Sequence, residues 1–212
     1  MKRMRSVWLV LAVPAALCGC SVSVNKSVAL GDGKIMRASH HMVNGNVTIG
    51  ANCDVRGTCA SVNGGITVGP DSRIDTVQTV NGPIELGERV LVRGGIASVN
   101  GLIRCHPGVE IERDIASVNG KVELTGTAVA RDIRICNAYV TLLQRSTVAG
   151  DIIIRGHDHG HSDSRHRVEI HVADGSIIKG DIVVRDTDAD VAVYLAEGGT
   201  VQGRIEGATV FR

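Results

Sequence analysis

Short segments in which apolar and polar residues alternate recur along the chain, and many of them end at the dipeptide Asn-Gly. The tetrapeptide Ser-Val-Asn-Gly stands at positions 61–64, 98–101 and 117–120, with near copies at 42–45 and 79–82. Alternation with a period of two is typical of strands that bury one face. Val, Ile and Thr dominate these segments and favour strands over helices. The pattern therefore predicts an all-β protein.

The spacing of the Asn positions indicates a repeat of about 18–19 residues. Such a unit is too short for two helices, but it fits one turn of a single-stranded parallel β-helix, also called a β-solenoid. Apolar residues three places after each Asn form one column of the expected core, consisting of Val47, Ile66, Ile84, Ile103, Val122 and Val140. Successive turns would stack about 4.8 Å apart. Right-handed crossovers between parallel strands are the rule, so a right-handed solenoid is expected.

The Asn-Gly pairs are expected to form the corners of the solenoid. Asn tolerates the left-handed backbone region and Gly enters it freely, so the pair suits a sharp turn. Stacked corners would align the Asn amides in a hydrogen-bonded ladder. The members of this predicted ladder are Asn44, Asn63, Asn81, Asn100, Asn119 and Asn137.

The repeat continues in a modified form toward the C-terminus. Gly150-Asp151-Ile152 matches Gly180-Asp181-Ile182, and Gly203-Arg204-Ile205 is similar to both. The step from Gly150 to Gly180 is longer than the next one, which predicts an insertion at about positions 157–167. We therefore expect a solenoid of about eight turns over positions 42–212, with a tether and an N-terminal cap over positions 20–41.

The first nineteen residues resemble a bacterial lipoprotein signal peptide. Basic Lys2, Arg3 and Arg5 precede an apolar run that is too short to span a bilayer. Leu17-Cys18-Gly19-Cys20 then resembles the lipobox. The resemblance implies removal of positions 1–19 and acylation of Cys20. Because the next residue is Ser21 and not Asp, it also implies the outer membrane, facing the periplasm or the cell surface; ordinary cleavage or a short anchor is the alternative.

The charge balance argues against a nucleic-acid partner. The chain has 23 basic and 22 acidic residues, and removal of the three basic residues of the predicted signal peptide leaves 20 basic ones. A nearly neutral chain has no long-range attraction for a polyanion. The expected partners are the membrane, through the lipid anchor, and an envelope protein or a second copy of the chain.

The repeats resemble two families of bacterial β-solenoid. Positions 42–140 are similar to an adhesin-like family with repeated (Ser/Thr)-Val-x-Gly-x-(Ile/Val) turns. The Gly-Asp-Ile segments resemble those of the bactofilin-like, polymer-forming group, which implies filaments built end to end. This chain departs from the cytoplasmic bactofilins by its secretion signal.

Four cysteines follow Cys20, and three of them occupy columns otherwise filled by Val, Ile and Leu. The predicted role is that of small buried hydrophobic residues. An exported protein can form disulfides, and Cys53 with Cys59 is the candidate pair.

The predicted insertion is rich in histidine. His157, His159, His161 and His166 lie in it, with His171 following. Imidazoles with nearby carboxylates suit Zn²⁺, Ni²⁺ or Cu²⁺. A solvated polar loop without metal is the alternative, and no other cofactor is expected.

The sequence favours a non-enzymatic structural or binding role in the envelope. No cluster of catalytic residues or phosphate-binding loop is recognisable, and few aromatic residues are available to stack on sugars. The alternatives are a periplasmic metal-binding protein that acts through the His-rich loop, and a self-assembling scaffold that pairs through its unpaired end strands.

Overall fold

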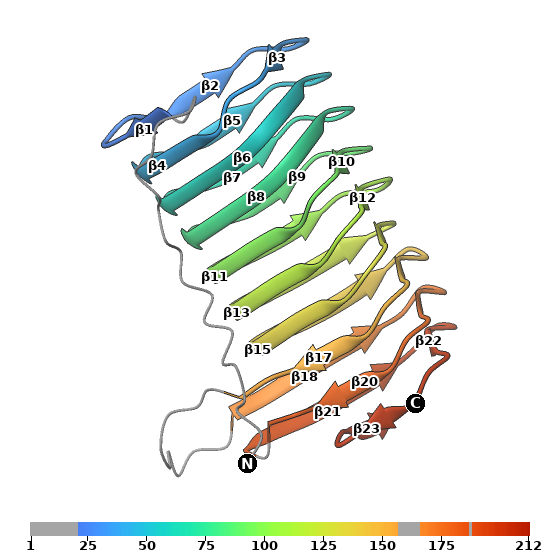
Figure 1. Cartoon of the computed structure of the whole chain (residues 1–212). Helices are drawn as coiled ribbons and strands as arrows, with labels where there is room; N and C mark the ends of the chain where they lie inside the picture. The colour runs from blue at the N-terminus through green and yellow to red at the C-terminus, as the bar shows by residue number, and fades with distance from the viewer. Residues whose placement is uncertain (1–20, 157–165, 187) are drawn as a thin grey trace, which may run out of the picture.

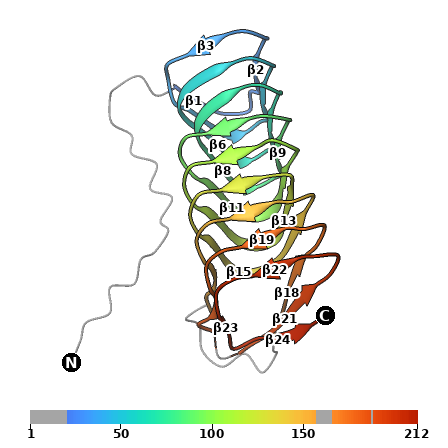
Figure 2. The ribbon, with the colours of Figure 1, turned by 90° about the vertical axis from the view of Figure 1, so that its right-hand side faces the viewer.

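A computed structural model describes residues 21–156, 166–186 and 188–212, which form a rod of stacked turns (Figure 1). All 24 strands pair in parallel within one continuous sheet. Figure 2 shows the same turns from the side, stacked one on another along the rod. No described residue is helical, and the strands wind into about 9 turns. The predicted all-β, parallel β-solenoid is confirmed.

Each turn contributes strands to three columns, and every strand pairs with its equivalents one turn away. The first column contains β1 (Ser21–Ser23), β4 (His40–Asn44), β6 (Asp54–Asn63), β8 (Arg73–Asn81), β11 (Ile96–Cys105), β13 (Ile115–Thr125), β15 (Ile133–Leu143), β17 (Ile152–Ile154), β20 (Ile182–Val184) and β23 (Ile205–Glu206). The second contains β2 (Val28–Leu30), β5 (Val47–Ile49), β7 (Ile66–Val68), β9 (Ile84–Leu86), the later parts of β11, β13 and β15, β18 (His166–Val172), β21 (Ala189–Leu195) and β24 (Thr209–Phe211).

The third column consists mostly of two-residue strands. It contains β3 (Ile35–Met36), the first parts of β6 and β8, β10 (Leu91–Val92), β12 (Glu110–Ile111), β14 (Ala128–Val129), β16 (Thr147–Val148), β19 (Ile177–Ile178) and β22 (Thr200–Val201). The three columns enclose a core that runs the length of the rod.

The core is made of aliphatic residues stacked on their equivalents. The predicted column three places after each Asn is completely buried at Val47, Ile66, Ile84, Ile103, Val122 and Val140. Ile170 and Val193 continue it through the later turns. Full burial of one such side chain stabilises the fold by about 1.5–3 kcal/mol. A core without aromatic residues is therefore adequate, because each turn adds its own set of buried side chains.

The sequence predicts a tether and an N-terminal cap before position 42. β1, β2 and β3 pair with β4, β5 and β6, so positions 21–39 form a first turn of the solenoid. Val28 and Leu30 align with Val47 and Ile49 of the next turn. The repeat is hard to recognise here because the equivalent Asn, Asn25, is followed by Lys and not by Gly.

The Asn-Gly corners do not use the left-handed region as expected. None of the six predicted Asn residues has a positive φ, and among the glycines that follow five of them only Gly120 does. A positive φ recurs instead at the corner between the second and third columns, at Gly33, Asn52, Asp71, Arg89, Gly108 and Gly126.

Glycine follows Asn because the backbones of neighbouring turns approach closely at this corner. A Cβ at Gly64 would collide with the carbonyl oxygen of Gly45, and a Cβ at Gly101 would collide with that of Gly82. The regular spacing of Gly thus reflects contact between turns rather than the conformation of one turn.

We expect Gly101→Ala to destabilise the rod, because the added methyl group must push two paired turns apart. The loss in the free energy of unfolding should be about 1–3 kcal/mol, the usual cost of overpacking. Urea unfolding of a fragment covering positions 21–212 measures it. The control is Gly31→Ala, since a Cβ there has no atom within 4 Å. Equal losses in the two variants would contradict this explanation.

Candidate functional site

The corner asparagines form a ladder of side-chain hydrogen bonds along the rod. Each Asn Nδ2 donates to the Oδ1 of the Asn one turn earlier, over 2.8–3.0 Å, through Asn25, Asn44, Asn63, Asn81, Asn100 and Asn119. Asn137 aligns with Asn119 in the register, although the two amides are not hydrogen-bonded. The amides of the ladder are engaged with one another, so it is a structural element rather than a ligand site.

A second ladder consists of aspartates and has no counterpart among the sequence-based predictions. The Oδ1 atoms of Asp114, Asp132, Asp151 and Asp181 each accept a hydrogen bond from the backbone N–H of the equivalent residue in the next turn, over 2.7–3.2 Å. The carboxylates of Asp132, Asp151 and Asp181 each lie over a glycine of the next turn. A Cβ at Gly150 or Gly180 would collide with the preceding Asp Oδ1. This contact explains the repeated Gly-Asp-Ile segments.

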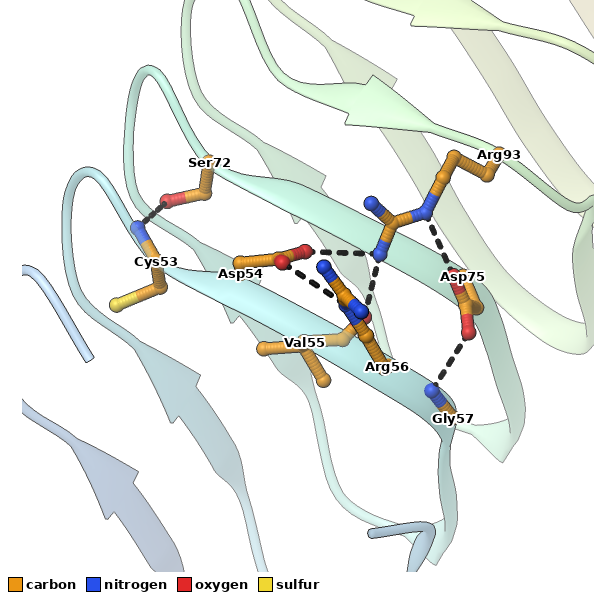
Figure 3. A network of polar contacts seen from close by, with 8 residues as sticks. All are labelled: Cys53, Asp54, Val55, Arg56, Gly57, Ser72, Asp75 and Arg93. Carbon is orange, nitrogen blue, oxygen red and sulfur yellow. Dashed lines mark hydrogen bonds and ion pairs between the residues drawn. The ribbon is translucent and has the colours of Figure 1, made fainter. Parts of the chain in front are cut away.

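An arginine joins three successive turns in the N-terminal half of the rod (Figure 3). Arg93 Nε donates to Asp75 Oδ1 over 2.7 Å, and one terminal nitrogen of Arg93 donates to Asp54 Oδ1 over 2.9 Å and to the Val55 carbonyl over 3.2 Å. Asp75 Oδ2 also accepts the N–H of Gly57 over 2.8 Å. These bonds cross the irregularity in β6, where the register with β8 shifts between Val55 and Thr58.

The Arg93 network favours the charged form of Asp54. The hydrogen bond from Arg93, aided by one from Arg56, lowers the pKa of Asp54 below its ordinary value. The hydrogen bonds that Arg93 donates to Asp75 and Asp54 raise its own pKa, and the bond to Asp75 has the larger effect. The pair of Arg93 and Asp54 is therefore ionised at neutral pH, and its chemistry is that of a clamp rather than of an acid or base.

The predicted metal ligands are not brought together by the described part of the structure. His157, His159 and His161 lie outside the described residues. His166 opens β18, where its backbone pairs with Ala189. Within the residues that the structure describes, no three His, Cys, Asp or Glu side chains are close enough to hold a metal ion.

His171 instead belongs to a stack of rings on the outer face of the last turns. Its ring lies 4.5 Å from that of Tyr194, which lies 4.9 Å from that of Phe211, and both pairs are nearly parallel. His171 Nε2 is 3.3 Å from Glu169 Oε2. Arg167 donates to the Tyr194 hydroxyl over 3.0 Å. The stack follows from the register, which places His171 opposite Tyr194 and Tyr194 opposite Phe211.

The cysteines after position 20 are unpaired, so the candidate disulfide between Cys53 and Cys59 is wrong. Cys53 directly precedes the part of β6 that belongs to the third column, whereas Cys59 lies in the part that belongs to the first column. Burial raises the pKa of the Cys59 thiol to about 12 and does the same at Cys105. A reactive thiolate is therefore disfavoured at both positions.

Comparison of the chain with family models, curated proteins and solved structures found no match. No described segment forms a helix of the length and hydropathy needed to cross a membrane.

We expect Arg93→Gln to destabilise the rod at pH 7 by about 1 kcal/mol, the upper end for partly exposed ion pairs. Because the pKa of Asp54 is lowered in the folded state, its stabilising contribution exists above the unfolded pKa and disappears as the pH falls through the folded value. The difference between wild type and Arg93→Gln should therefore shrink in strong acid. Urea unfolding at pH 7 and at about pH 2.5 measures this.

The matched control for Arg93 is Arg56→Gln, which removes a more exposed arginine that is ion-paired with Asp54 but not with Asp75. It should cost clearly less than Arg93→Gln at pH 7. A loss at Arg93 that does not depend on pH would mean that packing, and not charge, carries its effect.

Proposed function

We propose that the chain is a non-enzymatic envelope lipoprotein, a rod held at the outer membrane by acylated Cys20 and acting as a structural or binding element. The observation that carries this proposal is the position of the first strand. β1 covers Ser21–Ser23, the residues directly after Cys20. Acyl chains on Cys20 would thus attach to the end of the solenoid with no linker between.

The charges of the first turn suit such a placement. Lys26, Lys34 and Arg37 are exposed there, and Asp32 is the only acidic residue between positions 21 and 39. Basic groups near an anionic lipid surface contribute about 1 kcal/mol each. The first turn would face the lipid headgroups, and the later turns would extend away from them.

The outer surface supports a role without catalysis. The carboxylates of the aspartate ladder accept hydrogen bonds from backbone N–H groups. Asp54 and Asp75 accept hydrogen bonds from arginine, and Asp75 also accepts one from a backbone N–H. Groups committed in this way maintain the shape of the rod. We therefore infer that the surface presents binding groups and not a reaction centre.

The anchor is tested by comparing two neighbouring cysteines in cells supplied with labelled palmitate. We expect the wild type and Cys18→Ala to incorporate label and to lose positions 1–19, as intact mass shows. Cys20→Ala should incorporate no label, because the acylated thiol is gone. Label in Cys20→Ala, or none in the wild type, would refute the anchor.

A second candidate function, end-to-end self-assembly, is favoured by the open ends of the rod. Within the described residues, the strands of the first and last turns pair on one side only. Exposed apolar side chains accompany both ends, with Val24 and Ile35 at the first turn and Val210 and Phe211 at the last. Such edges are templates for another chain. The two candidates compete, because an anchored first turn faces lipid.

Sedimentation of a fragment covering positions 21–212 over a range of concentrations tests the second candidate. We expect masses that rise with concentration and fall back to the monomer in Ile35→Lys, because a charge at the open edge opposes pairing. Tyr139→Lys, an exposed change on the side of the rod, should assemble as the wild type does. A monomer at every concentration would exclude this candidate.

A further inference from the structure

A shallow open hollow of about 330 Å³ lies on the outer face of the rod beside the Arg93 network. Residues from three successive turns line it. They are Asp75 and Thr76 from the first turn, Arg93, Gly94 and Gly95 from the second, and Arg113 from the third. This volume is at the lower end for small-molecule sites. Two adjacent glycines, Gly94 and Gly95, belong to this lining, and a Cβ at either one would collide with the backbone of a neighbouring turn.

The hollow coincides with a gap in the aspartate ladder. Because Ile96 pairs with Ile115 and Ile115 with Ile133, Gly95 occupies the column of Asp114 and Asp132. In the next turns an Asp Oδ1 of this column accepts the N–H of the following turn. Gly95 has no carboxylate to offer. The N–H of Asp114 therefore has no acceptor among the described residues. The N–H of Gly95 has none either, and the residue before it in this column is Thr76 and not an aspartate.

The charged groups around the gap leave one cation without a partner. Arg93 is already bound by Asp54 and Asp75. The Asp114 carboxylate faces the next turn, where it contacts Arg134 over 3.1 Å and accepts the N–H of Asp132. Arg113 is exposed and has no ion pair or hydrogen bond from its side chain within the described chain.

The groups left over at the hollow are thus donors. They are the Arg113 guanidinium and the Gly95 N–H from the lining, together with the N–H of Asp114, which directly follows Arg113 in the chain. The neighbouring acidic groups except exposed Glu112 are already engaged. A planar carboxylate matches this set, because guanidinium can hold both of its oxygens while an oxygen also accepts a backbone N–H. One turn later in the ladder, an internal aspartate already provides such an acceptor.

We propose that this hollow is a binding site for a carboxylate ligand, which takes the position of the aspartate that the ladder lacks at Gly95. Arg113 holds the carboxylate, and the N–H of Asp114 donates to it. The carboxylate belongs to a small organic acid or to the free end of a peptide. This inference is independent of the lipid anchor and gives the rod a ligand site on its side.

The test follows the backbone amide signals of the full chain, purified in a non-ionic detergent, by ¹⁵N–¹H NMR. Sodium acetate should shift the Gly95 and Asp114 signals in a saturable way, beyond the shift caused by sodium chloride at equal ionic strength. Arg113→Gln should weaken acetate binding by about tenfold or more, since the charged partner is lost.

The matched control is Arg131→Gln. Arg131 stands in the same column one turn later, is also exposed and has no ion pair among the described residues, but there the Asp114 carboxylate fills the ladder position. Arg131→Gln should bind acetate as the wild type does. Equal binding by Arg113→Gln and the wild type, or shifts no larger than those caused by chloride, would overturn the proposal.

Acetyl-triglycine and its amide distinguish the two sources of carboxylate. The free acid should bind and the amide should not. Tighter binding of the acid than of acetate would assign the site to peptide ends, and equal or weaker binding would assign it to small organic acids. Binding of the amide as tight as that of the acid would overturn the requirement for a carboxylate.

Discussion

Parallel main-chain hydrogen bonding between turns fixes this structure, because it sets each residue directly over its equivalent in the preceding turn. Strand spacing of about 4.8 Å brings like side chains into contact over the whole rod. Aliphatic residues then meet aliphatic residues, and amides meet amides. The core, the two polar ladders and the ring stack of His171, Tyr194 and Phe211 all result from one register.

The same constraint decides which small residues are tolerated at the corners. A turn can come close to its neighbour only where no Cβ stands between them, and this applies at Gly64 and Gly101 and again beside the aspartate ladder at Gly150 and Gly180. Glycine therefore marks contacts between turns. The left-handed corner follows a different rule, since Asn52, Asp71 and Arg89 share a positive φ without sharing a residue type.

The sequence is sufficient to predict the fold because the period of its Asn-Gly corners is also the period of the strand pairing. The sequence does not predict the first turn, which lacks the Asn-Gly pair. Asn25 lacks the following Gly, so the pattern predicts a tether and an N-terminal cap where the structure has a first turn. The Arg93 network could not be predicted, because it depends on an irregularity in β6 and on one arginine that reaches two turns back. The aspartate ladder has a signal in Gly-Asp-Ile, but its hydrogen bonds are visible only with the turns stacked.

Strand pairing is maintained even across the longest repeat unit, from Gly150 to Gly180. β17 pairs with β20 residue for residue, Ile152 with Ile182 and Ile154 with Val184, although the chain between them is much longer than in the regular turns. Additional residues between these strands leave the register of the columns unchanged. The pairing of these two strands therefore does not depend on the length of the chain that connects them. The framework of the rod is thus compatible with connections of different length.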